Sequence, residues 1–384
     1  MKLKILNILL VILLSVTAGT LSYHFFHMEK PPAKISAKTS DYDTYRYGSS
    51  HEKVIDIGTQ PNSLSGPFLT ETLFHDRILK QHLAQEGWIL RSHGYRNGKD
   101  MLPYANGRLD VMMLGDIPAI QAMNRNNIGI FALCRQGYNA VISNRRLTPY
   151  ELKGLRVGYP PGTAAHFTLE RTLESAGLSM KDTIPVALQP DEMESELRNH
   201  HVDAVAVWEP FLATILKNIP GSISIATSDT FSYIAVDLDF ANRHPVLLKN
   251  MLASFVRITR WIKHDENNIH TGLIWVRDAA IRFQGESPIQ TNMKWMSLLK
   301  SETINNPSFP MIPMNSLDKQ GIHHQQFIFL KKARLLAENA EWEMLIGRIF
   351  IRDLPDIIKN GQAWQIDRFD YTSDNLYQGD GKLP

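Results

Sequence analysis

The stretch from Arg156 to His166 contains residues that could bind a ligand at the start of a helix. A Pro-Pro-Gly turn leads into Thr163, whose side-chain oxygen can cap the first turn of a helix. The small residues Ala164 and Ala165 follow, so a ligand could approach free backbone N–H groups at the positive end of the helix dipole. An anion or a strong hydrogen-bond acceptor would suit that position. The pattern also fits an ordinary strand-to-helix connection, and the segment alone leaves both interpretations open.

Strand and helix patterns alternate along the chain on both sides of this stretch. Apolar strand patterns occur at 53–58, 88–93, 109–114, 128–133, 140–143, 156–159, 185–188, 202–208 and 231–237. Long helical patterns include 67–85, 245–263 and 329–343. This order predicts an α/β fold with a parallel sheet and helices on both faces, where ligands bind beyond the carboxyl ends of the strands. Three loops follow such strand ends, and they contain Gly115 and Asp116, Thr163, and Trp208 and Glu209.

Composition excludes several classes of protein. A chain of 384 residues with 43% hydrophobic content can bury a large core, and its length predicts two globular units. The chain has 41 Lys and Arg against 39 Asp and Glu, so we expect no positively charged surface that would bind nucleic acid. The single Cys134 rules out an internal disulfide, and its apolar surroundings predict a buried small hydrophobe. The pairs His200–His201 and His323–His324 lack metal-ligand spacing and are expected on the surface. No metal, cofactor or catalytic residue is predicted.

The N-terminus predicts export from the cytoplasm. Lys2 and Lys4 precede an apolar run at 5–16, as in a secretory signal. Residues 16–18 offer a small-residue cleavage pattern, yet apolar character resumes at Leu21, so residues 5–26 could instead remain as a membrane anchor. Residues 1–28 are therefore expected to be a cleaved signal peptide or an anchor. Residues 29–51 are expected to form a tether. The predicted location is periplasmic or extracytoplasmic, soluble or anchored to the inner membrane.

Four motifs in order carry a family resemblance. They are DVMMLGDIPAIQA, LTPYELKGLRVGYPPGTAAH, HHVDAVAVWEPFLA and FANRHPVLLKNMLASFVRITRWI. The chain from about 53 to 300 resembles the solute-binding proteins of ABC importers for sulfonates, nitrate, taurine and thiamine precursors. The resemblance implies a type II periplasmic-binding-protein fold, with a ligand cleft between two lobes. The first lobe would hold 52–138 and 230–300, and the second would hold 139–229. Residues 301–384 exceed the usual length of the family and are expected to form an extra helical region.

The resemblance also implies a set of ligand-binding residues. They are Gln60, Pro61 and Asn62 in the first loop, Gly115 and Asp116 in the second, Thr163, Ala164, Ala165 and His166 in the third, and Trp208 and Glu209 in the fourth. Thr163 and the amides after it would accept an anionic group, and Trp208 would supply an apolar wall or an indole donor. Ionised Asp116 and Glu209 would favour a cationic or donating end of the ligand.

Structural alternatives stand beside these roles. They are an N-cap role for Asp116, a core position for Trp208, a solvated or paired Glu209, and an exposed position for His166. The loops also lack an obvious arginine for an anion, although Arg135, Arg145 and Arg146 lie nearby in sequence.

The function implied by the resemblance is binding, without covalent chemistry. A small-molecule ligand would be captured outside the cytoplasm and delivered to an ABC permease in the membrane. Two alternatives stay open on the same fold. One is a membrane-tethered sensor or adaptor, and the other is an enzyme of the thiamine-precursor type, although the sequence contains no nucleophile elbow, metalloprotease motif or phosphate-binding loop.

Overall fold

The computed structural model describes residues 41–48 and 52–372. The predicted signal peptide or anchor at 1–28 lies outside the described residues, as does most of the predicted tether. The chain divides into a unit of residues 1–44 and a unit of residues 45–384. The described part of the first unit is a 3-10 turn, η1 (Asp41–Thr44). No helix in the described ranges is long and apolar enough to cross a membrane.

One eight-stranded mixed sheet organises the second unit. Its strands are β1 (Val54–Thr59), β2 (Ile89–Gly94), β3 (Val111–Gly115), β4 (Ile128–Ser143), β5 (Arg156–Tyr159), β6 (Ile184–Ala187), β7 (Ala204–Trp208) and β8 (Ile223–Asp237). They are arranged in the order β2-β1-β3-β8-β4-β7-β5-β6. The group β1–β3 forms one parallel part of the sheet, and the group β5–β7 forms another. We call the regions built on these two groups lobe 1 and lobe 2.

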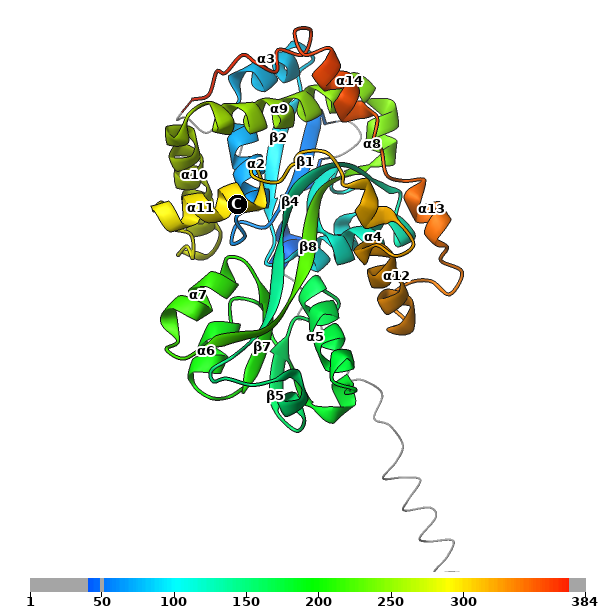
Figure 1. Cartoon of the computed structure of the whole chain (residues 1–384). Helices are drawn as coiled ribbons and strands as arrows, with labels where there is room; N and C mark the ends of the chain where they lie inside the picture. Colours follow the sequence, from blue (N-terminus) through cyan, green and yellow to red (C-terminus); the bar gives the residue numbers. More distant parts are fainter. Residues whose placement is uncertain (1–40, 49–51, 373–384) are drawn as a thin grey trace, which may run out of the picture. The chain divides into compact units, whose positions relative to one another are not determined.

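The long strands β4 and β8 join the two lobes, and their antiparallel pairing makes the sheet mixed, whereas the alternation of elements predicted a parallel sheet. They pair with each other antiparallel from Ile128 to Ser143, and each also pairs antiparallel with a strand of one lobe. Figure 1 shows them running from one lobe into the other. The sequence predicted two short strands at 128–133 and 140–143, whereas β4 is continuous. Polar residues and register irregularities near Leu133 and Arg135 hide its continuity from a simple apolar pattern.

Helices cover both faces of lobe 2, as the alternation of elements predicted. Helix α5 (Ala164–Ser175) packs Leu169 and Leu173 against Val157 of β5. On the other side, α6 (Met193–Arg198) and α7 (Phe211–Asn218) pack Leu197 and Ile215 against the strands. The shorter elements of this lobe are η3 (Pro149–Leu152) and η4 (Met180–Asp182).

Lobe 1 is built around the other strand group. Its elements are α2 (Ser65–Phe74), α3 (Arg77–Gln85), η2 (Gly98–Tyr104), α4 (Asp116–Arg125), α8 (Leu238–Arg243), α9 (Pro245–His264), α10 (Glu266–Gln284) and α11 (Met293–Glu302). The single helix predicted at 67–85 is wrong, because the chain breaks at His75. Asp76 then caps α3 by accepting hydrogen bonds from the amides of Ile78 and Leu79.

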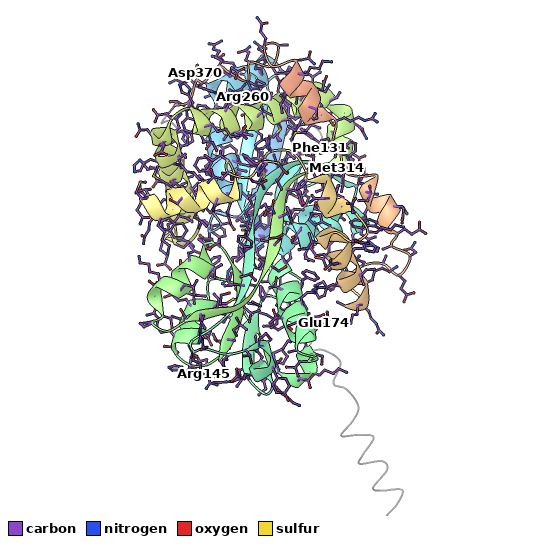
Figure 2. The ribbon with its side chains drawn as sticks, in the orientation of Figure 1. Phe131, Arg145, Glu174, Arg260, Met314 and Asp370 are labelled. Atoms are coloured by element: carbon purple, nitrogen blue, oxygen red, sulfur yellow. The ribbon has the colours of Figure 1, made fainter. Side chains whose placement is uncertain are left out.

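The C-terminal region adds η5 (Met314–Leu317), α12 (Ile322–Lys332), α13 (Trp342–Ile346) and α14 (Asp353–Lys359). Helix α12 ends at Lys332, so the long helix predicted at 329–343 is wrong. Phe350 stacks on Phe131 of β4 with ring centroids 4.5 Å apart, which fixes this region to the sheet. Figure 2 places Arg260 and Asp370 near α9, while Arg145 lies at the far end of lobe 2.

The last described residues of the predicted tether pack on lobe 1. Tyr45 is 6% exposed, and the ring of Tyr47 stacks on His93 with centroids 4.7 Å apart. The backbone N–H of Gly48 donates to Asp56 Oδ2 over 2.5 Å. Residues 45–48 of the predicted tether therefore belong to the packed structure of lobe 1.

Candidate ligand-binding site

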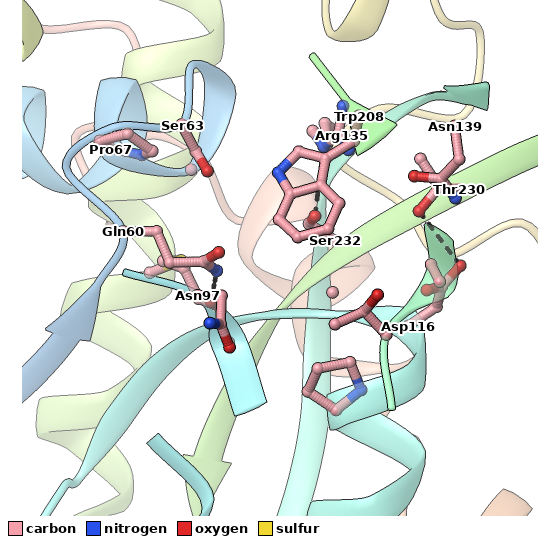
Figure 3. Close-up of a pocket in the computed structure, with 17 residues that line it drawn as sticks. Gln60, Ser63, Pro67, Asn97, Asp116, Arg135, Asn139, Trp208, Thr230 and Ser232 are labelled. Atoms are coloured by element: carbon pink, nitrogen blue, oxygen red, sulfur yellow. Dashed lines mark hydrogen bonds between the residues drawn. The ribbon is translucent and has the colours of Figure 1, made fainter. Parts of the chain in front are cut away.

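A cavity lies where strands from both lobes meet β4 and β8. It holds about 610 Å³ of unfilled space, including its opening to solvent. Its described lining consists of Gln60, Ser63, Gly66, Pro67, Asn97, Gly98, Met113, Gly115, Asp116, Pro118, Arg135, Asn139, Thr163, Ala164, Trp208, Thr230 and Ser232. Figure 3 shows Gln60, Ser63 and Pro67 on one side of this space, facing Trp208 and Arg135 on the other.

Six of the predicted binding residues line this cavity: Gln60, Gly115, Asp116, Thr163, Ala164 and Trp208. Thr163 caps α5 as the sequence indicated, accepting from the amide of His166 over 3.4 Å and donating to the carbonyl of Pro160 over 2.7 Å. Gln60 donates from Nε2 to the carbonyl of Met113 over 2.9 Å, which ties the first loop to the end of β3. The structure thus brings the predicted loops together.

The other five predicted residues do not line the cavity. Pro61 and Asn62 are buried beside it, and Asn62 donates to Gln284 of α10 over 2.6 Å. Ala165 is fully buried in the core between α5 and the strands of lobe 2. Glu209 accepts from the amide of Ala213 over 2.9 Å and lines a separate hollow beside Tyr138.

His166 also lies outside the lining of the cavity. Its ring packs beside Tyr159 and against Phe329 of α12, with centroids 4.7 and 5.1 Å away. Burial, reinforced by the charge of Lys99, lowers the pKa of His166 to about 4. The imidazole is therefore neutral at pH 7, and its position is that of a packed side chain rather than an exposed one.

Asp116 is fully buried, and its acceptor capacity is used by the protein. One oxygen accepts from the amide of Ile117, and the other accepts from Thr230, from the amide of Phe231 and from Gln326 at 2.7 Å. Burial raises the pKa of Asp116, and the hydrogen bonds from Gln326 and the two amides counteract that rise. The carboxylate stabilises the junction of α4, β8 and α12, and it has little capacity left to accept from a cationic ligand.

Arg135 of β4 supplies the cationic group that the binding loops lacked. Its Nε donates to Ser232 over 3.3 Å, and its Nη1 contacts Glu302 of α11. Glu302 is 3% exposed and also accepts from Ser65 over 2.6 Å. Arg135 and Asp116 are the two charged residues in the described lining. Because Arg135 is paired with Glu302, its charge is already largely compensated.

Sequence reasoning missed most of the polar groups on the crossing strands. Asn139, Thr230 and Ser232 line the cavity, and the amide of Asn139 is 1% exposed with no hydrogen-bond partner for either Nδ2 or Oδ1. Ser63 and Asn97 were missed on lobe 1. A usable signal existed, because polar residues two or four positions apart inside an apolar strand share one face of the sheet.

Polar contacts join the lobes along the edge of the cavity. Arg96 Nη2 lies 2.7 and 2.8 Å from the two carboxylate oxygens of Asp191. Asn97, which lines the cavity, donates to Gln189 over 2.9 Å, and Lys99 donates to the carbonyl of Pro161 over 3.2 Å. These contacts hold the two walls against each other.

The structure tests the predicted positions of Cys134 and of the histidine pairs. Cys134 is fully buried, as predicted. The expected surface position of His323 is wrong, because its side chain is 4% exposed and contacts the hydroxyl of Tyr233 beneath α12. Within the described ranges, no group of three His, Cys, Asp or Glu side chains could hold a metal ion.

Comparison with known sequences finds similarity to proteins named as binding proteins. Residues 119–272 match the NMT1-like family. A protein of Brucella abortus, named only as a binding protein, is 24% identical over 188 residues, which cover 44% of this chain and 56% of the relative. A protein of Escherichia coli named as an aliphatic sulfonates-binding protein is 27% identical, covering 54% of this chain and 66% of that protein. This chain therefore matches little more than half the length of the first of these relatives.

Solved structures show the same two-lobe fold. The periplasmic aliphatic sulphonate binding protein SsuA from Escherichia coli superposes with a TM-score of 0.57 and 20% identity, covering 78% of this chain and 92% of its own. The desulfurization enzyme DSZB shares the fold with a TM-score of 0.53 and 13% identity, covering 81% of this chain and 100% of its own. At these identities the likeness establishes the fold, and both binding proteins and an enzyme use it.

Proposed function

Since this chain is a relative of the sulfonate-binding proteins of ABC importers, we propose that it binds a small polar organic solute outside the cytoplasm and delivers it to an ABC permease. The solute is sulfonate-like, taurine-like or thiamine-precursor-like in size and polarity. The observation that carries the proposal is the cavity itself. It joins the capped N-terminus of α5 at Thr163, the indole of Trp208 and the side chain of Arg135 around one space.

The chemistry of the lining fits binding better than catalysis. The amides at the start of α5 and the guanidinium of Arg135 are donors for an accepting group of the ligand. Trp208 adds an apolar surface on the same side of the cavity as Arg135, and small-ligand sites usually combine a few polar groups with such a surface. Burial raises the pKa of the Cys134 thiol, which makes this cysteine a poor nucleophile.

Ligand-dependent stabilisation tests the proposal. A ligand that binds only the folded protein stabilises it by about 2.7 kcal/mol at a concentration of 100 Kd. We expect the melting temperature of the full-length protein to rise with at least one member of a panel of alkanesulfonates, taurine, amines, pyrimidines and small anions. Calorimetric titration of each hit then measures its affinity. A panel that leaves the melting temperature unchanged throughout contradicts solute capture.

The contacts of α12 with both lobes favour a second candidate function, a membrane-tethered sensor or adaptor. Phe329 packs on His166 and Phe167 of α5, while Gln326 on the same helix contacts Asp116 of α4. A partner protein that binds α12 would therefore respond to a change in the position of one lobe relative to the other. Isolation of the protein from membranes distinguishes the two functions, because import predicts co-purifying permease chains and sensing predicts kinase chains.

A further inference from the structure

Asn139 and Trp208 form a side-by-side pair on the wall of the cavity. They are directly opposite each other in the antiparallel ladder of β4 and β7, so their side chains project from the same face of the sheet. Both residues line the cavity. The wall therefore presents a flat aromatic surface next to a carboxamide (Figure 3).

The amide of Asn139 has no partner inside the protein. It is 1% exposed, and neither Nδ2 nor Oδ1 has a hydrogen bond. Buried polar groups are nearly always paired, and leaving them unpaired destabilises the folded state. Exchanging the N and O positions of the amide does not change this conclusion, because either orientation leaves one donor and one acceptor together.

The charges around the cavity favour a ligand without net charge at this wall. Arg135 is paired with Glu302, and the carboxylate of Asp116 is surrounded by protein donors. A charged group placed beside Asn139 would lose its hydration without gaining an uncompensated opposite charge. An uncharged group with both a donor and an acceptor can hydrogen-bond Oδ1 and Nδ2 of Asn139 without the free-energy cost of burying a charge.

We propose that Asn139 and Trp208 select a flat solute with an uncharged amide edge. This inference rests on the proposed function, because it concerns the solute bound in the same cavity. The ligand class is a carboxamide, a cyclic amide or a ureide. Its adjacent N–H and C=O pair with Oδ1 and Nδ2 of Asn139, while its plane lies against the indole of Trp208. The accepting groups on the remainder of the solute face the first amides of α5.

Three probes that share a phenyl ring test this selection. Benzamide offers a donor beside an acceptor, benzamidinium offers two donors, and benzenesulfonate offers only acceptors and a negative charge. Calorimetric titration of the full-length protein is expected to show benzamide binding at least tenfold more tightly than either of the other probes. Exchanging the edge of the probe while retaining its ring separates recognition by Asn139 from stacking on Trp208.

Two substitutions at the same position sharpen the test. Asn139→Asp keeps the shape but accepts at both oxygens, so it is expected to reverse the preference toward benzamidinium. Asn139→Leu is expected to weaken benzamide binding at least tenfold without lowering the melting temperature of the ligand-free protein, because it removes unpaired polar atoms. Asn144→Leu is the control on the surface just beyond β4, where Asn144 contacts His200, and it is expected to retain wild-type affinity.

The outcomes separate this inference from the proposed function. Tighter binding of benzenesulfonate than of benzamide, unchanged by Asn139→Leu, retains solute binding and overturns the amide selection. Binding of a solute from the broader panel, with none of the three phenyl probes binding, also overturns the amide selection alone. No binding of any panel member or phenyl probe overturns both proposals. Benzamide binding that is unaffected by both Asn139 substitutions overturns the role of Asn139.

Discussion

Gln326 Nε2 lies 2.7 Å from Asp116 Oδ2, so a residue of the C-terminal region directly stabilises a carboxylate in the wall of the cavity. Both side chains are fully buried. This contact gives α12 a role in the cavity even though Gln326 does not line it. The C-terminal region therefore belongs to the architecture of the candidate site.

Replacing Gln326 by leucine is expected to destabilise the protein by about 1–3 kcal/mol, because a buried carboxylate loses a hydrogen-bond donor. Affinity for the solute is expected to fall as well, since Asp116 also fixes β8 through the amide of Phe231. Denaturant unfolding and calorimetric titration measure the two effects. Gln325→Leu is the matched control one residue away, and it is expected to cost less than about 0.5 kcal/mol. Equal costs for the two variants would exclude the supporting role of Gln326.

Trp208→Ala and Thr163→Val are each expected to weaken binding of the cognate solute by about tenfold, or about 1.4 kcal/mol. Trp208→Ala removes the aromatic wall, and Thr163→Val removes the hydroxyl at the start of α5. Because Thr163 also caps that helix, its substitution is expected to reduce stability by about 1 kcal/mol. Affinity is therefore compared at a temperature where both variants are fully folded by circular dichroism. Unchanged affinity in both variants would contradict the placement of the solute in this cavity.

The sequence predicted the loops of the site better than its walls. Thr163 and Asp116 follow short apolar strands and Trp208 ends one, so the strand pattern indicated these three strand ends, and the family resemblance then implied binding residues there. Arg135 and Asn139 lie inside β4, whose polar positions break the apolar pattern. The role of Arg135 depends on its tertiary partner Glu302, which is distant in sequence and offers no local signal, and Asn139 has no hydrogen-bond partner inside the protein.

Local sequence patterns also predicted part of the fold and failed where an element depends on its particular capping or terminating residues. Local periodicity identified the strands and helices of lobe 2, where each helix packs on the adjacent strands. It failed at His75, where the cap formed by Asp76 divides one apolar pattern into two helices. It also failed after Lys332, where α12 ends and Arg334 adopts a positive φ of 56°.

Glu71 is expected to make the folded protein less stable as the pH rises from about 4.5 to about 7. Burial raises the pKa of Glu71 to about 7, although Arg282 lies 3.1 Å away and opposes the rise. In this pH window the folded state holds a proton that the unfolded state has lost, so the free energy of unfolding falls with pH. This one carboxyl lowers the free energy of unfolding by about 3 kcal/mol at most across that pH window.

Urea unfolding of wild type and Glu71→Gln across pH 4 to 8 measures that contribution. The variant is expected to show a flatter dependence of the free energy of unfolding on pH, because a glutamine side chain does not titrate. Glu338→Gln is the control, since Glu338 is exposed and its side chain stays in water in both states. Parallel curves for wild type and Glu71→Gln would show that Glu71 is charged in the folded protein at neutral pH.

Arg257 and Arg260 lie on the same helix, α9, and provide a matched comparison of buried and exposed ion pairs. Arg257 Nη2 lies 2.7 Å from Asp76 Oδ2 in a pair whose side chains are 2% and 0% exposed. Arg257 Nη1 also donates to the carbonyls of Trp364 and Gln365, so it anchors the C-terminal segment. Arg260 pairs with Asp367, whose side chain is 70% exposed.

Arg257→Met is expected to destabilise the protein by about 3–5 kcal/mol, because Asp76 is left as an uncompensated buried charge. Arg260→Met is expected to cost at most about 1 kcal/mol, since exposed ion pairs contribute little. Asp76→Asn combined with Arg257→Met is expected to recover part of the loss, because the double variant removes the buried charge. Recovery would assign the cost to charge burial rather than to lost packing of the arginine stem. A double variant no more stable than Arg257→Met alone would instead assign the cost to packing and to the released C-terminal carbonyls.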